Sequence, residues 1–203
     1  MRGLFVTFEG IDRSGKTTQA RLLCEALGHE ALAVREPGGT EAGERLREIL
    51  KDPAVALTAQ TEALLFAAAR AELVEQVIRP ALDDGRIVVS DRFLDSSLAY
   101  QGGARGLGID EVERINRFAT GGLRPDLTFL LEISPGAAVG RAGESDRFEG
   151  EGEGLQREVL AAYEELAAAD PGRWRSIDAD RPPEQVHADV LAAVEAARAS
   201  APA

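Results

Sequence analysis

The chain has 203 residues and a formal net charge of −12, with 23 Lys and Arg against 35 Asp and Glu. That length is enough for one domain with a sizeable core, and we expect a single domain over residues 1–203. The negative charge argues against a nucleic-acid polymer as partner, because neutralising a phosphate backbone needs a basic face. A small anionic ligand needs only a local cluster of cations.

The N-terminus runs directly into an apolar segment without a basic leader, and no apolar run approaches the roughly 20 residues of a membrane span. We therefore expect a cytoplasmic protein that has no membrane partner. The single cysteine, Cys24, lies among apolar positions of an expected helix. This placement favours a buried thiol over a reactive one.

Short apolar runs alternate with longer helical segments along the chain. The expected strands lie at 4–8, 31–34, 87–89, 127–131 and 174–177, and are mostly uninterrupted, as strands covered on both faces should be. The expected helices lie at 16–27, 40–51, 58–84, 110–119, 155–169 and 182–199. The alternation predicts an α/β fold of three layers, with a central parallel five-stranded sheet and helices on both faces.

The strongest chemical signal follows the first expected strand, in the stretch FVTFEGIDRSGKTTQ at residues 5–19. Its pattern Gly10-x4-Gly15-Lys16-Thr17 stands between a strand and a helix, which is the context of a P-loop. Backbone N–H groups there face an anion, Lys16 reaches the outer phosphates, and the Thr17 hydroxyl meets Mg²⁺. The ATP phosphate site is therefore predicted at Gly10, Ile11, Asp12, Arg13, Ser14, Gly15, Lys16, Thr17 and Thr18.

A P-loop alone does not separate a kinase from a GTPase switch or an ATP-driven motor. Lys16 and Lys51 are the only lysines, and neither sits in an Asn-Lys-x-Asp guanine-reading motif, so a Ras-like switch is disfavoured. A plain glycine turn is the structural alternative to the P-loop itself.

A second charged cluster, Asp91 and Arg92, closes the apolar run 87–89. Ligands of open α/β sheets bind outside the carboxyl ends of the strands, so both side chains should enter the crevice of the P-loop. Asp91 would orient Mg²⁺ through water, and Arg92 would bind a second phosphate with its planar fork. The alternative is an Asp-Arg pair that only caps the next turn.

Phe66 and Arg70 stand four residues apart in an expected helix and so share one face. A flat ring beside a hydrogen-bond donor suits a nucleobase, which stacks on the ring and offers a carbonyl to the donor. An apolar helix with a surface arginine is the alternative.

The segment GRAGESDRFEGEGEG at 140–154 cannot build a core and is expected to be a mobile loop, or else a disordered surface insert. Arg141 and Arg147 are its only cations. Residues 143–154 sum to −4, from one Arg against four Glu and one Asp.

The motifs together resemble the thymidylate kinase family, which moves the γ-phosphoryl group of ATP to dTMP. The resemblance rests on FEGIDRSGKTT, REPGGT at 35–40, LLFAAARAEL at 64–73, DRFLDSSLAYQGGARG at 91–106 and SIDAD at 176–180. These segments span nearly the whole chain in the right order. The resemblance implies a P-loop NTPase fold, a homodimer, and synthesis of dTDP on the route to dTTP.

The resemblance also implies roles for single residues. It places thymine against Phe66 and Arg70, with Ser97 and Gln101 lining the base pocket, and Tyr100 where a ribose 2′-hydroxyl would clash. It places the dTMP phosphate on Arg92 and Arg35, the sugar 3′-hydroxyl on Asp12, and the adenine beside Ala179. Phe93 stands where the family often has Tyr or His.

The segment 140–154 corresponds to the family's lid, in which many bacterial members carry several basic residues. An acidic lid neutralises a transferring phosphoryl group poorly, so Arg13 becomes the expected catalytic arginine, alongside Lys16, Asp12 and Arg92. An arginine paired with Asp12 or with a lid acid is the alternative for Arg13. For the whole chain, another nucleoside monophosphate kinase and an ATP-binding regulatory switch remain as alternative functions.

Overall fold

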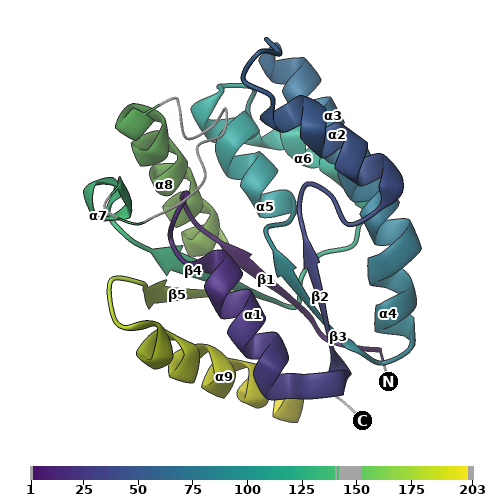
Figure 1. The fold of residues 1–203 in the computed structure, drawn as a ribbon, viewed down its shortest axis with the longest axis vertical. Coiled ribbons are helices and arrows are strands. Elements are labelled where there is room, and N and C mark those ends of the chain that lie inside the picture. The colour runs from purple at the N-terminus through teal and green to yellow at the C-terminus, as the bar shows by residue number, and fades with distance from the viewer. Residues whose placement is uncertain (1, 140, 142–151, 201–203) are drawn as a thin grey trace.

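The computed structural model describes residues 2–139, 141 and 152–200, and within them one parallel sheet of five strands has the order β2-β3-β1-β4-β5 (Figure 1). The strands are β1 Phe5–Glu9, β2 Ala31–Arg35, β3 Ile87–Asp91, β4 Leu127–Glu132 and β5 Trp174–Asp178. The central strand β1 pairs with both β3 and β4, so that Phe8 lies opposite Asp91 on one side and Phe129 on the other. The predicted five-stranded parallel sheet is confirmed.

The helices follow the strands in alternation. They are α1 Lys16–Leu27, α2 Glu41–Lys51, α3 Ala59–Leu73, α4 Arg79–Asp83, α5 Leu94–Ser97, α6 Ile109–Thr120, α7 Pro135–Val139, α8 Gly152–Ala169 and α9 Pro183–Ser200. A 3₁₀ turn, η1 Gly28–Glu30, and two π-helical segments, η2 Val74–Ile78 and η3 Leu98–Ala104, complete them. No helix of the described ranges is long and apolar enough to cross a membrane.

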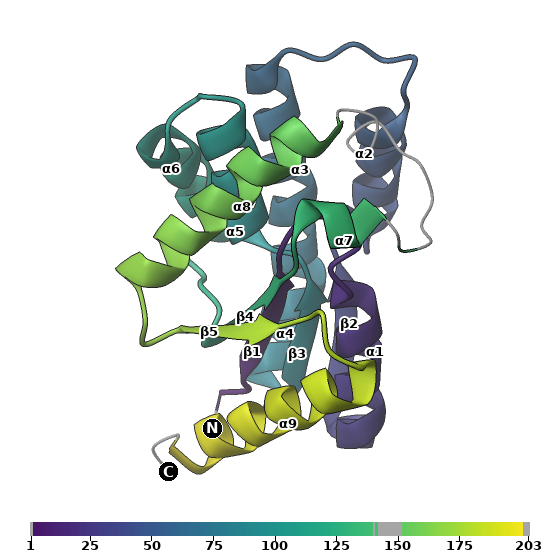
Figure 2. The same cartoon turned by 90° about the vertical axis from the view of Figure 1, so that its left-hand side faces the viewer.

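Helices cover the sheet on both faces, which explains why the strand sequences are nearly continuous apolar runs. On one face α1 and α9 pack against Val6, Phe8 and Phe129, and the rings of Phe8 and Phe129 stack with centroids 5.2 Å apart. On the other face Phe5 and Val88 meet η2, α4 and α6, while Leu130 meets α8. Figure 2 shows β5 between α8 and α9.

The structure differs from the expected elements at three places. The expected helix 58–84 is confirmed as helical, since α3, η2 and α4 follow one another without a break, but its middle part is π-helical. Residues 94–104 lie outside the expected helices and form α5 and η3. Residues 152–154 belong to helix α8 and not to a loop, whereas the other residues expected in the lid, except Arg141, lie outside the described residues.

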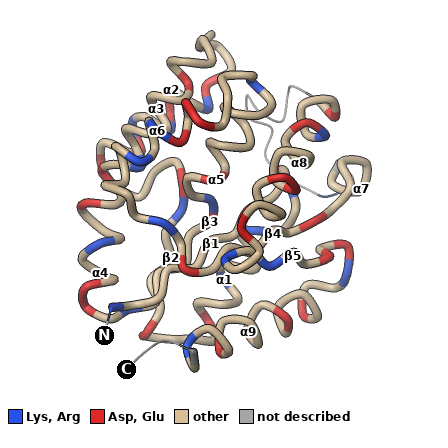
Figure 3. Tube along the Cα trace, turned by 180° about the vertical axis from the view of Figure 1, so that it is seen from behind, with Lys and Arg blue, Asp and Glu red and all other residues tan. Residues whose placement is uncertain are grey.

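Threonine side chains cap the N-termini of α2 and α3. The Thr40 hydroxyl accepts from the N–H of Gly43 at the start of α2, and the Thr58 hydroxyl accepts from the N–H of Thr61 at the start of α3. Each satisfies a helix N–H that has no partner within the helix. Figure 3 shows basic and acidic residues mixed along α2 and α8, so neither helix presents one sign of charge alone.

Candidate active site

The P-loop connects β1 to α1 and depends on two glycines with positive φ. Gly10 has φ 139°, and a Cβ there would stand 2.7 Å from the carbonyl oxygen of Leu131. Gly15 has φ 99° and precedes the first turn of α1. Only glycine adopts these conformations without strain, so the two glycines permit the loop conformation in which backbone N–H groups and the N-terminus of α1 can face an anion.

Lys16 is buried inside this loop. Its ammonium donates to the Ile11 carbonyl at 2.6 Å and to the Ser14 hydroxyl at 3.2 Å. Burial, helped by the charge of Arg92, lowers the pKa of Lys16 to about 8, although Asp12 opposes the shift. The loop therefore contains a desolvated cation whose charge is strongly felt by an approaching anion.

Arg92 follows β3 and points back to the P-loop. Its Nη2 donates to Asp12 Oδ1 at 2.6 Å, and its Nη1 donates to the Gly10 carbonyl at 3.1 Å and to the Ser96 hydroxyl at 3.0 Å. Its φ of 73° is positive, as is that of Arg13 at 61°. Non-glycine residues are rare in this region, and such strain concentrates at functional sites.

The Asp12 carboxylate accepts the hydrogen bond from Arg92 Nη2. Burial opposes ionisation of this carboxyl, but Arg92, Lys16 and Gln156 outweigh burial and lower the pKa of Asp12. Gln156 of α8 donates to Asp12 Oδ2 at 2.9 Å and accepts from the Asp12 N–H at 3.1 Å. Helix α8 is thereby connected to the P-loop.

Glu9 has no exposed surface, and its carboxylate contacts the same Ser96 hydroxyl as Arg92 does. Its carboxylate accepts from the Phe93 N–H at 2.8 Å, the Ser96 hydroxyl at 2.6 Å and the Tyr163 hydroxyl at 2.7 Å. Burial, with a further contribution from Asp95, raises the pKa of Glu9 to about 7. This carboxyl orders the backbone and side chains directly around Arg92.

Glu9 should make stability depend on pH. Its pKa is about 7 in the folded chain, compared with an ordinary value of 4.5 that we take for the unfolded chain. Between these two values the folded state binds more protons than the unfolded state, so the folded state loses stability as pH rises through this range. We expect wild type to lose about 2 kcal/mol relative to Glu9→Gln between pH 5 and pH 7. Urea unfolding of both proteins at pH 5, 6 and 7 measures this, and parallel pH profiles would contradict it.

A pocket of about 360 Å³ opens beside the P-loop and brings together most of the predicted acceptor residues. Its lining includes Asp12, Arg13, Lys16, Thr17, Arg35, Phe66, Asp91, Arg92, Ser97, Tyr100 and Gln101. Phe66 comes from α3, whereas Ser97, Tyr100 and Gln101 come from α5 and η3. A flat ring, several arginines and several hydrogen-bonding groups in one pocket can hold an aromatic base and a phosphate together.

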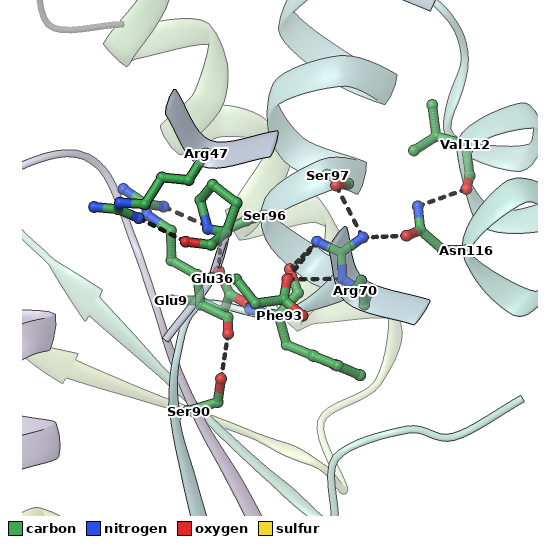
Figure 4. A network of polar contacts seen from close by, with 12 residues as sticks. Glu9, Glu36, Arg47, Arg70, Ser90, Phe93, Ser96, Ser97, Val112 and Asn116 are labelled. Carbon is green, nitrogen blue, oxygen red and sulfur yellow. Dashed lines mark hydrogen bonds and ion pairs between the residues drawn. The ribbon is translucent and has the colours of Figure 1, made fainter. Parts of the chain in front are cut away.

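Arg70 differs from the other predicted base contacts because it does not line this pocket. It is 1% exposed, and its guanidinium donates to Glu36 at 2.7 Å, to Ser97 at 3.1 Å, to the Phe93 carbonyl at 3.2 Å and to Asn116 (Figure 4). Arg70 therefore lies behind the lining residues Glu36 and Ser97. A direct bond from Arg70 to a base stays a prediction.

A second pocket, of about 500 Å³, lies on the other side of the P-loop. The loop's own residues line it together with Arg141 and Ala179, and Ala179 is the position predicted beside adenine. Arg141 donates to the Ala179 carbonyl at 2.6 Å and to the Arg13 carbonyl at 3.4 Å. Arg13, Lys16 and Thr17 line both pockets.

Thr17 and Asp91 meet at the mouth of the first pocket, where the Thr17 hydroxyl donates to Asp91 Oδ2 at 2.5 Å. A hydroxyl beside a carboxylate is a hard oxygen pair, the donor chemistry that Mg²⁺ prefers when phosphates complete its coordination. The two residues therefore fit the predicted metal role.

Several residues of the site were not anticipated. Glu9, Glu62 and Gln156 support Arg92, Gln101 and Asp12 respectively, while Arg47 and Lys51 of α2 line the first pocket. The spacing of Arg47 and Lys51, four residues apart on α2, is a signal that could have found one cationic helix face. The buried supports have no local signal, since each contacts its partner across 39 or more residues.

Comparison with known proteins identifies this arrangement. The family model described as thymidylate kinase matches residues 8–190. The thymidylate kinase of Desulforudis audaxviator is 52% identical over 188 residues, covering 89% of this chain and 85% of that protein. Those of Lactobacillus helveticus and Pelotomaculum thermopropionicum are 47% and 49% identical and cover 96% of this chain, and 97% and 94% of their own lengths. The chain belongs to the thymidylate kinase family.

Proposed function

We propose that this chain phosphorylates dTMP to dTDP with ATP, in the biosynthesis of dTTP. The observation that carries the proposal is the pair of pockets that meet at Arg13, Lys16 and Thr17. A phosphoryl donor in one pocket and an acceptor in the other would approach each other across these side chains. Family membership supplies the identity of the two substrates.

Phosphoryl transfer is catalysed mainly by positioning and by neutralising negative charge. We propose that ATP places its phosphates on the N–H groups of residues 10–18, and that Lys16 exchanges its loop acceptors for phosphate oxygens. Arg92, with Arg35, holds the phosphate of dTMP in line with the γ-phosphoryl group. Asp12 accepts from the sugar 3′-hydroxyl, and the adenine lies near Ala179.

Enzymes of this kind use a divalent metal together with ATP, and we propose that the metal here is Mg²⁺ near Thr17 and Asp91. When bound, Mg²⁺ neutralises phosphate charge. The hydroxyl of Thr17 and the carboxylate of Asp91 are its proposed partners, the latter through water.

Three further features belong to the proposal. We assign residues 1–203 to one kinase domain with a lid near 140–154, and place the enzyme in the cytoplasm. We also propose a homodimer, supported by Phe118 of α6, which is 91% exposed, and by Leu64 of α3, which is 56% exposed. Helix α3 contacts α6, so the two side chains lie on neighbouring helices. Size-exclusion chromatography of wild type and Phe118→Asp tests the dimer, because the charged side chain should shift the protein from dimer to monomer.

Acceptor dependence tests the proposed reaction. Turnover of ATP should be fast with dTMP, slower with dUMP, and slower still with UMP or without an acceptor. Equal turnover with UMP would favour another nucleoside monophosphate kinase. Slow hydrolysis that ignores every acceptor would favour a regulatory switch.

Phe66→Ala should weaken dTMP binding. Removing a base–aromatic stack costs roughly 1–3 kcal/mol, so the KM for dTMP should rise about 5- to 150-fold while the KM for ATP stays unchanged. Steady-state kinetics with each substrate varied in turn measures both constants. Equal damage to the two KM values would mean that Phe66 serves only the core.

Tyr100→Ala should narrow the preference for dTMP over its ribo analogue. Tyr100 is 6% exposed, lines the first pocket, and lies with its ring 5.2 Å from the Arg92 guanidinium carbon, beside the proposed phosphate site. Removing the ring should lower the ratio of kcat/KM values by roughly 10-fold. Tyr100→Phe keeps the ring and should keep the ratio. An unchanged ratio in folded Tyr100→Ala would remove sugar selection from this residue.

A further inference from the structure

The side-chain amide of Gln101 is held from behind by a buried carboxylate. Gln101 Nε2 donates to Glu62 Oε1 at 2.8 Å, and the two side chains come from different elements, η3 and α3. Gln101 is 2% exposed and Glu62 is 1% exposed. Gln101 lines the acceptor pocket, whereas Glu62 does not.

The chemistry of Glu62 dictates which end of the amide faces it. Arg105 donates to both oxygens of Glu62, from Nε at 3.3 Å and from Nη2 at 3.4 Å. A carboxylate paired with a guanidinium accepts hydrogen bonds and donates none. The amide nitrogen of Gln101 must therefore point at Glu62, because a reversed amide would set its oxygen against a carboxylate oxygen. The planar amide then turns Oε1 away from Glu62.

We propose that Glu62 is a positioning residue that determines base specificity. It fixes the Gln101 amide so that Oε1 is the hydrogen-bond acceptor facing the first pocket, and the pocket therefore selects pyrimidines whose ring nitrogen N3 carries a proton. The inference rests on the proposed function and deepens it, since it assigns the reading of the base to a residue that does not line the pocket.

The pyrimidine bases differ at the atom concerned. Thymine and uracil carry an N3–H between two carbonyl groups, whereas cytosine presents a bare N3 beside an amino group. An acceptor fixed at Gln101 Oε1 bonds the N–H of thymine but meets the lone pair of cytosine. A buried acceptor left facing another acceptor is strongly unfavourable, which is how a polar pocket rejects a near-isosteric ligand.

The positions of Glu62 and Gln101 in the fold support a link between base stacking and base selection. Glu62 precedes Phe66 by four residues, one turn of α3, so one helix presents the ring that lines the pocket and the carboxylate that orients the amide. Gln101 lies in the π-helical segment η3, and Arg105 caps the end of that segment. Arg105 thus connects Glu62 back to the element that carries Gln101.

Glu62→Gln tests the proposal, because an amide at position 62 offers either a donor or an acceptor and frees Gln101 to reverse. We measure kcat/KM for dTMP and for dCMP, and the KM for ATP. The ratio of the two kcat/KM values should fall by about 10-fold or more, while the KM for ATP stays unchanged. Arg105→Lys keeps a cation beside Glu62 and should keep the ratio.

A Gln101→Leu background separates positioning from structure. There Glu62→Gln should change the ratio no further, since the amide through which Glu62 acts is gone. If Glu62→Gln does not fold, Glu62→Asp withdraws the carboxylate and should move the ratio in the same direction. An unchanged ratio in folded Glu62→Gln or Glu62→Asp, with Gln101 intact, overturns the proposal. Equal losses for dTMP, dCMP and ATP in such a variant also overturn it. A wild-type enzyme that does not use dTMP instead overturns the proposed function.

Discussion

Arg13→Ala is expected to lower kcat at least about 10²-fold with little change in either KM. This is the pattern of an interaction made in the transition state and not in the ground state. The expectation comes from position, because Arg13 lines both the first pocket, proposed for dTMP, and the second pocket, proposed for ATP. Arg13 therefore lies where the phosphoryl group would pass between the two proposed substrates. Its left-handed backbone, with φ 61°, is held by the loop that would bind ATP.

Arg141 is the matched control, because its guanidinium donates to the Arg13 carbonyl at 3.4 Å and so lies against the same part of the P-loop. Arg141 lines the second pocket but not the first, and its Nη2 donates to the Ala179 carbonyl at 2.6 Å. Arg141→Ala should therefore raise the KM for ATP more than it lowers kcat. Single-turnover measurements at saturating substrates separate the chemical step from binding and release.

Arg147 belongs to the segment expected to form a lid and lies outside the described residues, and it is the competing candidate. We expect Arg147→Ala to lower kcat less than Arg13→Ala, because the segment around it is acidic. Near-full kcat in Arg13→Ala, together with loss of activity in Arg141→Ala or Arg147→Ala, would place the catalytic arginine in the lid.

The sheet and the P-loop could be predicted because their signals are local. A strand buried on both faces is mostly apolar, and Phe5, Val6 and Phe8 of β1 are all fully buried. Gly10 and Gly15 are required by backbone conformations that other residues avoid. These requirements leave their mark on consecutive residues, so one sequence suffices to find them.

The helical segment after β3 was missed because its local preferences point elsewhere. Residues 94–104 contain Gly102 and Gly103, which disfavour a helix on propensity alone. In the structure a Cβ on Gly103 would stand 2.7 Å from the Ala162 side chain of α8, so close packing requires the glycine. Tertiary contact thus decides the conformation, and it puts Tyr100 and Gln101 in the pocket.

The buried side chains that support the site are the part that sequence reasoning could not reach. Glu9 and Tyr163 are separated by 154 positions, and Asp12 and Gln156 by 144. No periodicity connects such pairs. Arg70 shows that a local signal can also mislead. Helical spacing predicted that Arg70 shares a face with Phe66, but the fold buries Arg70 among hydrogen-bond acceptors behind the residues that line the first pocket.

Arg70→Met should destabilise the chain by roughly 3–5 kcal/mol, the cost of leaving a buried charge without its partner. Arg70 Nη2 lies 2.6 Å from Glu36 Oε2, and the two side chains are 1% and 3% exposed. Glu36 Oε1 is already buried without a hydrogen-bond partner. For a chain of this size the loss should lower Tm by about 6–20 °C.

The loss should also depend on pH. Burial raises the pKa of Glu36, and Arg70 opposes that rise, so removing Arg70 should raise this pKa further. As pH rises, Glu36 in the folded mutant therefore keeps its proton to a higher pH than Glu36 in the unfolded chain, and the folded state loses stability over that range. Arg70→Met should accordingly be closer to wild type at pH 5 than at pH 8, and thermal unfolding at the two values measures this. An equal loss at both values would mean that packing, and not charge, dominates.

The double variant Arg70→Met, Glu36→Gln separates the structural role of Arg70 from its predicted contact with thymine. Removing both charges should recover a large part of the lost stability, because replacing a buried ion pair with neutral groups costs far less than breaking it. If Arg70 also bonds the base carbonyl, the recovered double variant should still show a raised KM for dTMP and a normal KM for ATP. If its KM for dTMP equals that of Glu36→Gln alone, Arg70 only supports the pocket wall and the base is read by Gln101 and its neighbours.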